Sequence, residues 1–348
     1  MKQVISIRDL EEIVRQGGDV KAIPADAILT PAARDFLNDL EPRNNSASAS
    51  REAVAAGATK KVNASSPQTD LDAFFSSPTM QKLKEEICEV GRRLWSRAYV
   101  DGNGGNIAIR VAEDLALCTP TLVSKGFMKP ADLCLVDLNG NQKAGAKKRT
   151  SEILMHLEIM KRQPKALATV HCHPPHSTAF AVAGVEPPTC MIPEIEVFIG
   201  KVPIAPYRTP GTPEMGKLVA DLVEDHNTVL MGNHGAVSWS HLSVEDAYFK
   251  MEILEAYCRT VWVASQLGQP LKTFTAAQLQ DLLKIKQGLG IPDPRIGLKE
   301  CELCANDEWR PGVTCAVPDR VAEAAPDAEA EAAVRAITEE IMTRMSRT

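Results

Sequence analysis

Residues 167–180 read LATVHCHPPHSTAF, and they place three of the chain's seven histidines within six positions. The apolar run at the start of this stretch, with its β-branched Thr169 and Val170, predicts a buried strand. Alternate residues of a strand point to the same face of a sheet, so His171 and His173 are expected to project together. This geometry suits a metal site, although a strand end with solvated histidines has the same pattern.

A third candidate ligand is His234, which follows another apolar run in the sequence TVLMGNHGAVSW. The glycine after it is expected to let the backbone turn and to leave the imidazole exposed at the end of a strand. Three imidazoles and an open coordination position are typical of catalytic zinc, which polarises a substrate oxygen as a Lewis acid. A structural zinc site would normally have a fourth protein ligand.

Two further segments carry groups that suit the chemistry of such a site. Glu152 lies in KKRTSEILMH, where it is expected in the first turn of a helix and is favoured by the helix dipole. Many helices carry an ordinary glutamate there. The glycine-rich stretch DGNGGNIAIR, residues 101–110, can present backbone amides to an anion, or can simply form a hairpin.

The composition is that of an ordinary globular protein. The chain has 348 residues with 45 acidic and 39 basic side chains, a formal charge of -6, and no dense basic stripe, so nucleic-acid binding has little support. No segment reaches the roughly 20 apolar residues of a membrane helix, and the first residues lack a signal-peptide core. Nine cysteines in mostly apolar surroundings indicate reduced thiols. We therefore expect a cytoplasmic protein.

Strand-like and helical patterns alternate from Leu71 to about Gly290, which predicts an α/β fold. The expected strands are 107–111, 115–119, 133–137, 167–171, 202–205, 228–231 and 236–238. The expected helices include the stretch MQKLKEEICEVGRRLWSRAYV, residues 151–162 and 214–224, and a long one from Ser243 to about Leu267.

The chain divides into four predicted parts. Residues 1–40 form a small module with two amphipathic helices, and the Ser-, Ala- and Asn-rich residues 41–70 form a flexible linker. Residues 71–317 form the main domain. An Ala/Asp/Glu-rich spacer and an amphipathic helix occupy residues 318–348.

Five motifs occur in the order found in class II aldolases, namely Gly105-Asn-Ile, Thr119-Pro-Thr121, Thr150-Ser-Glu152, His171-X-His173 and Asn233-His-Gly235. Residues 80–269 therefore resemble the class II aldolase/adducin family. The resemblance implies a three-layer α/β/α fold with a central, largely antiparallel sheet. It also implies a homotetramer with active sites at subunit boundaries.

The resemblance assigns roles to individual residues. His171, His173 and His234 would hold one Zn²⁺ per subunit, and Glu152 would be the general acid/base. The positions that match the family's phosphate-binding residues are Gly105, Asn106, Thr121, Thr150 and Ser151. The implied reaction is that of a lyase, which cleaves L-fuculose or L-rhamnulose 1-phosphate to dihydroxyacetone phosphate and lactaldehyde.

The sequence departs from the family pattern at two positions. Leu122 stands where the fuculose-phosphate enzymes have glycine, so Ser124-Lys125-Gly126 is a second candidate for the phosphate loop. Met191 stands where those enzymes carry a tyrosine that protonates the leaving carbanion. Another hydroxyl, such as that of Tyr207 or one from the C-terminal tail, would have to replace it.

Other functions fit the same motifs. An epimerase or dehydratase of sugar phosphates would keep the histidines and the phosphate loop, and an adducin-like protein uses the fold as a non-catalytic scaffold. Cys301, Cys304 and Cys315 are candidate ligands of a second zinc or simply buried thiols.

The ends of the chain resemble the terminal segments of enzymes from bacterial microcompartments. Short amphipathic helices on flexible tethers dock onto partners, here the shell or the core enzymes of such a compartment. The alternative is that the C-terminal helix, with Val334, Ile337, Ile341 and Met345, closes the active site of its own subunit.

Overall fold

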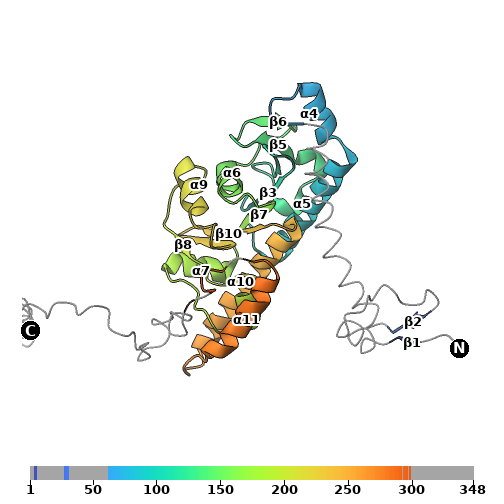
Figure 1. Ribbon diagram of the computed structural model, residues 1–348. Coiled ribbons are helices and arrows are strands. Elements are labelled where there is room, and N and C mark those ends of the chain that lie inside the picture. Colours follow the sequence, from blue (N-terminus) through green and yellow to red (C-terminus); the bar gives the residue numbers. More distant parts are fainter. Residues whose placement is uncertain (1–3, 6–26, 31–61, 292, 297, 299–348) are drawn as a thin grey trace, which may run out of the picture.

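An eight-stranded sheet forms the centre of the protein (Figure 1). The computed structural model describes residues 4–5, 27–30, 62–291, 293–296 and 298. Neighbouring strands of the sheet are antiparallel except for the parallel pair β8 and β9. In sheet order the strands are β6 (Gln142–Ala144), β5 (Cys134–Asp137), β4 (Leu115–Cys118), β3 (Asn106–Arg110), β7 (Ala168–Cys172), β10 (Gly235–Ser240), β9 (Thr228–Met231) and β8 (Ile204–Ala205).

Strand β7 lies in the middle of this sheet, between β3 and β10. All five of its residues are buried, because helices cover both faces of the sheet. The register places Asn106 of β3 opposite His171, with Val237 of β10 on the other side. Residues that are far apart in the sequence therefore meet at the end of β7.

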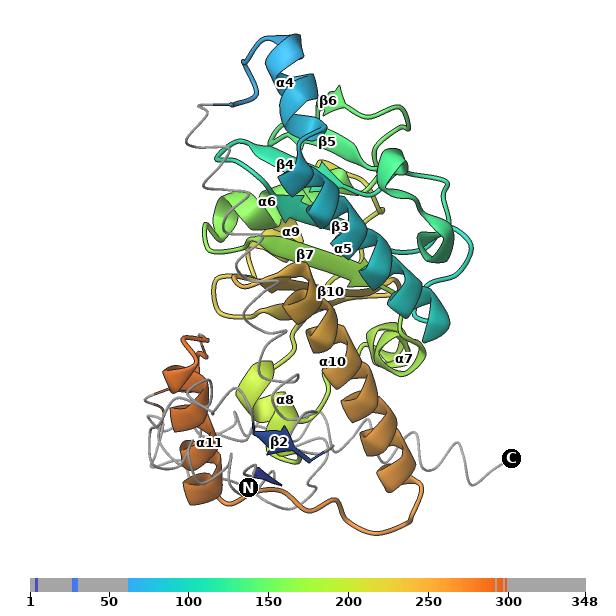
Figure 2. The same cartoon turned by 90° about the vertical axis from the view of Figure 1, so that its right-hand side faces the viewer.

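Helices α5 (Pro78–Ser96), α7 (Pro175–Ala183) and α10 (Val244–Ser265) cover one face of the sheet. Figure 2 shows α5 and α10 running across this face. The hydroxyls of Ser77 and Ser243 cap α5 and α10 by accepting bonds from backbone amides. The buried side chains of the helices pack against alternate strand residues such as Ile107 and Ile109.

Helices α6 (Ile153–Arg162) and α9 (Pro213–Ala220) cover the opposite face. Their apolar side chains pack against the other set of alternate residues, including Ala108 of β3 and Val237 of β10. The predicted three-layer fold with a largely antiparallel sheet is therefore confirmed.

Each of the seven predicted strands has a counterpart, whereas several other elements were not predicted. Strand β6 is short, polar and at the sheet edge, so it lacks an alternating apolar pattern. Helices α7 and α8 (Pro193–Phe198) are short and begin at prolines that also fit a loop. Also missed were α4 (Gln68–Phe75), α11 (Ala276–Gly288) and the 3₁₀ turns η1 (Lys125–Phe127) and η2 (Pro130–Asp132).

Parts of the predicted domain organisation fall outside the described residues. Near the N-terminus, β1 (Val4–Ile5) and β2 (Ile28–Leu29) form a parallel pair, and the two helices predicted within 1–40 lie outside the described ranges. Helix α4 begins at Gln68, inside the segment 41–70 that was predicted as a linker. The C-terminal segment 318–348 and the three cysteines from Cys301 to Cys315 are also outside the described residues.

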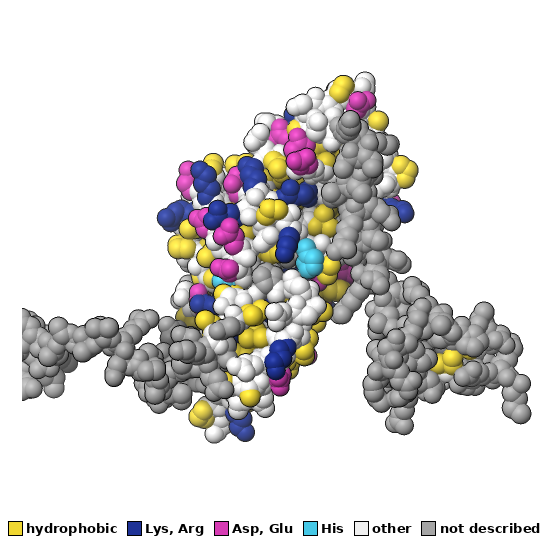
Figure 3. Space-filling view, in the orientation of Figure 1, with side chains coloured by type: hydrophobic (Ala, Val, Ile, Leu, Met, Phe, Trp, Pro, Cys, Tyr) yellow, Lys and Arg dark blue, Asp and Glu magenta, His cyan; other side chains and the backbone are white. Residues whose placement is uncertain are grey.

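Surface charge, helix character and cysteine state can each be compared with the expectations from composition. Basic and acidic side chains are interspersed on the face shown in Figure 3. Within the described ranges, no helix has the length and apolar character needed to cross a membrane. Five cysteines, Cys88, Cys118, Cys134, Cys172 and Cys258, are free and buried, as predicted for thiols, but Cys190 is in a disulfide.

A buried ionic network fastens α11 to the loop after α8. The Lys286 ammonium of α11 donates to the Asp293 carboxylate at 2.7 Å and to the Ile199 carbonyl at 2.7 Å. The Arg295 guanidinium also donates to Asp293 at 2.9 Å and is paired with Glu196 of α8 at 2.6 Å. Burial acts to raise the pKa of Asp293, but the bonds and charges of Arg295 and Lys286 lower it to about 2.

We predict that Asp293→Ala lowers the free energy of unfolding by about 3–5 kcal/mol, because it leaves two buried cations without their shared carboxylate. Urea unfolding followed by circular dichroism measures the change. Asp281→Ala is the control, because Asp281 and its partner Lys284 on the same helix are both 73% exposed. The control is expected to change stability by less than about 0.5 kcal/mol, and equal losses would contradict the role of the network.

Candidate metal centre

The end of β7 positions the first two histidines. His171 is completely buried, and its Nδ1 lies 2.8 Å from the carbonyl oxygen of Ala236 on β10. Since a carbonyl only accepts, Nδ1 carries the proton and Nε2 presents a lone pair. Two residues on, the backbone amide of His173 donates to the Tyr99 carbonyl at 2.8 Å, which holds this residue beside His171.

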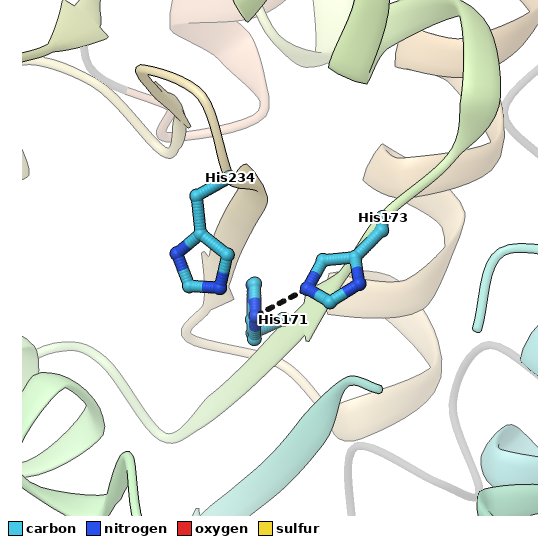
Figure 4. Close-up of side chains that lie close together, drawn as sticks. All are labelled: His171, His173 and His234. Atoms are coloured by element: carbon cyan, nitrogen blue, oxygen red, sulfur yellow. Dashed lines mark hydrogen bonds between the residues drawn. The ribbon is translucent and has the colours of Figure 1, made fainter. Parts of the chain in front are cut away.

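His234 approaches the same point from the turn between β9 and β10. Figure 4 shows the three imidazoles converging, and each offers a nitrogen within 4.8 Å of the others. The Nε2 atoms of His171 and His173 are 3.1 Å apart. The structure therefore brings together all three histidines that the sequence suggested as ligands.

The turn that carries His234 is built differently from the sequence prediction. Asn233, with φ 55°, adopts the left-handed conformation, whereas Gly235 already belongs to β10. Gly235 is needed for space, because a Cβ there would lie 2.5 Å from Cδ2 of His173. The His234 side chain is 12% exposed, so it is less exposed than predicted.

The surroundings favour neutral imidazoles. Burial lowers the pKa of His171 well below its usual value, and the neighbouring His173 and His234 lower it further. Burial likewise lowers the pKa of His173 and His234. Neutral imidazole is the form that binds a metal ion, so protons do not compete strongly with a cation here.

Glu152 faces the histidines from the position before the first residue of α6. Its carboxylate oxygens lie 3.3 Å from Nε2 of His234 and 3.4 Å from Nε2 of His171. The side-chain amide of Asn106 donates to Oε2 at 2.6 Å, whereas Oε1 is buried and accepts no hydrogen bond. One carboxylate oxygen is thus fixed and the other is free for a ligand.

Asn106 is held in turn by His156, a residue that the sequence analysis missed. His156 Nε2 lies 2.5 Å from Asn106 Oδ1, and its Nδ1 lies 2.6 Å from the Thr169 hydroxyl. Because the Asn106 amide nitrogen must face the carboxylate, its oxygen faces His156, whose Nε2 therefore donates. The spacing of four residues between Glu152 and His156 is the signal that could have indicated this arrangement.

A cavity of 360 Å³ opens beside these groups. It is lined by Glu152, His173 and all five residues predicted to bind phosphate, which are Gly105, Asn106, Thr121, Thr150 and Ser151. The glycine-rich turn contributes less than predicted, because the Asp101 carboxylate already accepts from the amides of Asn103 and Gly104. His176, the third histidine of the stretch 167–180, pairs with Glu255 of α10 at 2.7 Å and is not one of the three converging histidines.

Comparison with known proteins agrees with this fold and site. Residues 85–262 match the family described as Class II Aldolase and Adducin N-terminal domain. The chain belongs to the class II aldolase/adducin family. The L-fuculose phosphate aldolase of Methanococcus maripaludis is 35% identical over 182 residues, which are 52% of this chain and 97% of that relative.

Other relatives of this chain are named for different reactions. The 3-oxo-tetronate 4-phosphate decarboxylase of Cupriavidus necator is 36% identical over 181 residues, 51% of this chain and 82% of the relative. The structure of Klebsiella pneumoniae YgbL, whose assignment is open among aldolase, epimerase and decarboxylase, has a TM-score of 0.54 and 29% identity. It covers 58% of this chain and 98% of that protein. The predicted lyase class is confirmed by these relatives.

Leu122, which departs from the family pattern, has an unusual backbone conformation. Leu122 has φ 57°, a left-handed conformation that glycine adopts readily and leucine does not. Its side chain is 81% exposed, so the strain is not relieved by burial. The turn beside Thr121 thus has a conformation suited to glycine although the glycine is absent.

We predict that His156→Leu lowers the free energy of unfolding by about 1–3 kcal/mol, because it leaves buried Asn106 and Thr169 groups without their partner. His156→Gln should lose less, since its amide can still donate toward Asn106. Urea unfolding of the three proteins at pH 7 measures both changes. Equal losses in the two variants would contradict the role of the hydrogen bonds.

The pH dependence provides a second check on this residue. Burial lowers the pKa of His156 to about 3, from 6.5 in the unfolded chain. The neutral ring therefore makes its full contribution to stability above pH 6.5. That contribution is lost as the pH falls from 6.5 toward 3, by up to about 1.4 kcal/mol per pH unit. The stability difference between wild type and His156→Gln should therefore shrink from pH 7 to pH 5, and a constant difference would contradict the assignment.

Proposed function

We propose that the protein is a zinc-dependent lyase that cleaves a carbon–carbon bond of a ketose 1-phosphate. The observation that carries the proposal is the convergence of three neutral imidazoles and the Glu152 carboxylate beside one polar cavity. The bond to the Ala236 carbonyl fixes the His171 ring, and the bond from the Asn106 amide fixes one oxygen of Glu152. The arrangement is therefore preorganised for a reaction that needs both a cation and a proton carrier.

His171, His173 and His234 would hold the Zn²⁺ ion. The donor set fits, because it consists of three neutral nitrogen ligands and leaves a coordination position open. Bound there, the ion would stabilise negative charge on a substrate oxygen. The other groups in the cavity would bind the substrate and move protons.

Glu152 would act as the general acid/base. In the cleavage, a substrate hydroxyl loses its proton, the adjacent carbon–carbon bond breaks, and the electron pair stays on the dihydroxyacetone phosphate fragment as an enediolate. A proton must then reach that carbon. Asn106 fixes one oxygen of Glu152, so the other oxygen, Oε1, is available to carry the proton.

The substrates that we propose are L-fuculose or L-rhamnulose 1-phosphate, with lactaldehyde as the second product. Gly105, Asn106, Thr121, Thr150 and Ser151 would bind the phosphate with amides and hydroxyls. The family's tyrosine is replaced by Met191, which is packed against the core. Tyr207 shares a small pocket with His234 and would supply the missing hydroxyl.

Decarboxylation of a 3-oxo acid phosphate is the second candidate. Loss of CO₂ leaves the same kind of electron pair beside a carbonyl, so the same cation would serve. The 36% identical decarboxylase relative and the absence of the family's tyrosine favour this candidate. Homotetramer formation and docking in a microcompartment stay predictions from the resemblance.

An assay with each substrate separates these reactions. Release of dihydroxyacetone phosphate from the deoxyketose phosphates supports the aldolase, and release of CO₂ from 3-oxo-tetronate 4-phosphate supports the decarboxylase. Pentulose phosphate interconversion without cleavage would instead support an epimerase. A protein that binds no zinc and turns over none of these compounds would favour the scaffold.

We predict that His173→Ala loses the bound metal and nearly all activity, because two histidines are too few to retain zinc. Elemental analysis of purified protein measures zinc per chain, and added chelator should inactivate wild type. His226→Ala is the control, since this histidine bonds to the Lys201 carbonyl at another part of the fold. Full zinc occupancy in His173→Ala would show that this residue is not a ligand.

We predict that Glu152→Gln retains zinc and lowers kcat by roughly 100- to 10,000-fold, because an amide cannot carry the proton. Glutamine keeps the size of the side chain, and its amide oxygen can accept the same bond from the Asn106 amide. Steady-state kinetics and elemental analysis on the same preparation test both parts. A variant as active as wild type would remove Glu152 from the mechanism.

A further inference from the structure

Lys125 is a buried cation that the mechanism above does not use. It begins the 3₁₀ turn η1, is 1% exposed and lines the cavity beside Thr121, Thr150 and Glu152. No other lysine or arginine belongs to the cavity lining as far as the chain is described. The cavity therefore has a single full positive side-chain charge.

The Lys125 ammonium is held by carbonyl groups only. It donates to the Val123 oxygen at 2.8 Å and to the Asn103 oxygen at 3.3 Å. An ammonium has three N–H donors, so one remains for a further acceptor. No described carboxylate forms an ion pair with Lys125.

Two of the three other buried lysines in the described part of the chain have a carboxylate partner. Lys250 is paired with Asp246, and Lys286 is paired with Asp293. Lys84 donates to the Phe75 carbonyl and lies over the Phe75 ring, away from the cavity. Burying a charge without a direct ion-pair partner is costly, so an ammonium at a cavity wall that bonds only to carbonyls indicates an anion supplied by a ligand.

The charge persists near neutral pH. Burial lowers the pKa of Lys125 to about 8, while the negative charges of Asp101 and Glu152 act to raise it. At pH 7 the ammonium form is therefore still favoured. The remaining donors in the cavity are hydroxyls and amides, which bind a phosphate but do not neutralise it.

We propose that Lys125 is the cation that binds the phosphate group of the substrate and selects phosphorylated over unphosphorylated sugars. This inference rests on the proposed function for the identity of the substrate, but the anion site stands on the geometry of the cavity. It also makes Ser124-Lys125-Gly126 part of the phosphate loop, as the sequence suggested because Leu122 replaces the family's glycine. A lysine binds phosphate as a point charge, so a neutral side chain cannot replace it.

The test compares Lys125→Met with Lys129→Met, a matched control at an exposed lysine in the same segment. Inorganic phosphate and dihydroxyacetone phosphate are the charged probes, and dihydroxyacetone is the neutral probe. Ligand-observed NMR and calorimetry measure binding to zinc-loaded protein. We expect Lys125→Met to weaken the binding of both charged probes by roughly 10- to 100-fold. The binding of dihydroxyacetone and the zinc content should not change, and Lys129→Met should bind all three probes as wild type does.

Three outcomes would overturn the proposal. Unchanged phosphate binding in Lys125→Met would remove the residue from the site. An equal loss for dihydroxyacetone, or a loss of zinc, would show that the lysine only supports the local fold. A variant that loses affinity for malonate but not for phosphate would assign the ammonium to a carboxylate.

The proposed function can fail separately. If wild type cleaves none of the ketose phosphates but loses phosphate binding on Lys125→Met, the reaction is wrong and the anion site stands. If cleavage is found and phosphate binding does not depend on Lys125, the proposed reaction stands and the assignment of Lys125 to the anion site is wrong.

Discussion

The hydrogen bond from the His171 ring to the Ala236 carbonyl joins the two strands on which the site depends. It fixes which nitrogen of His171 is free, and it does so only because β7 and β10 are paired in one register. The same pairing brings Gly235 against His173 and places the turn with His234 above the strand end. On its other edge β7 brings Asn106 opposite His171. A slip of one residue in either pairing would separate these groups.

Much of this arrangement can be predicted from the sequence, but only the parts that depend on patterns between neighbouring residues. The alternation of apolar residues locates the strands, and the His-X-His spacing predicts two imidazoles on one face. His156 illustrates the limit, because its partners Asn106 and Thr169 come from different strands and are joined only by the sheet register. Lys125 shows a second limit, since burial of a lysine depends on the packing of η1 against α5. Strand β6 has no apolar period because it lies at an edge.

The site also concentrates features that work against stability. Burial favours the neutral form of three histidines, Leu122 has a backbone conformation suited to glycine, and Lys125 is buried with no direct carboxylate partner among the described residues. Strain and unpaired charge of this kind persist only where the surrounding structure fixes them. Here the fully buried strand β7 and the helices on both faces of the sheet supply that support. In the network of α11 the buried charges are paired, as is usual for groups with a purely structural role.

The ends of the central sheet have a consequence for how copies of this chain can associate. One edge is β6, with three residues, and the other is β8, with two. Long exposed edges invite another chain to continue the sheet by backbone pairing, and short edges offer few free amides and carbonyls for it. Association by strand addition is therefore disfavoured on both sides. The helices and loops remain as the surfaces through which an assembly of subunits would be built.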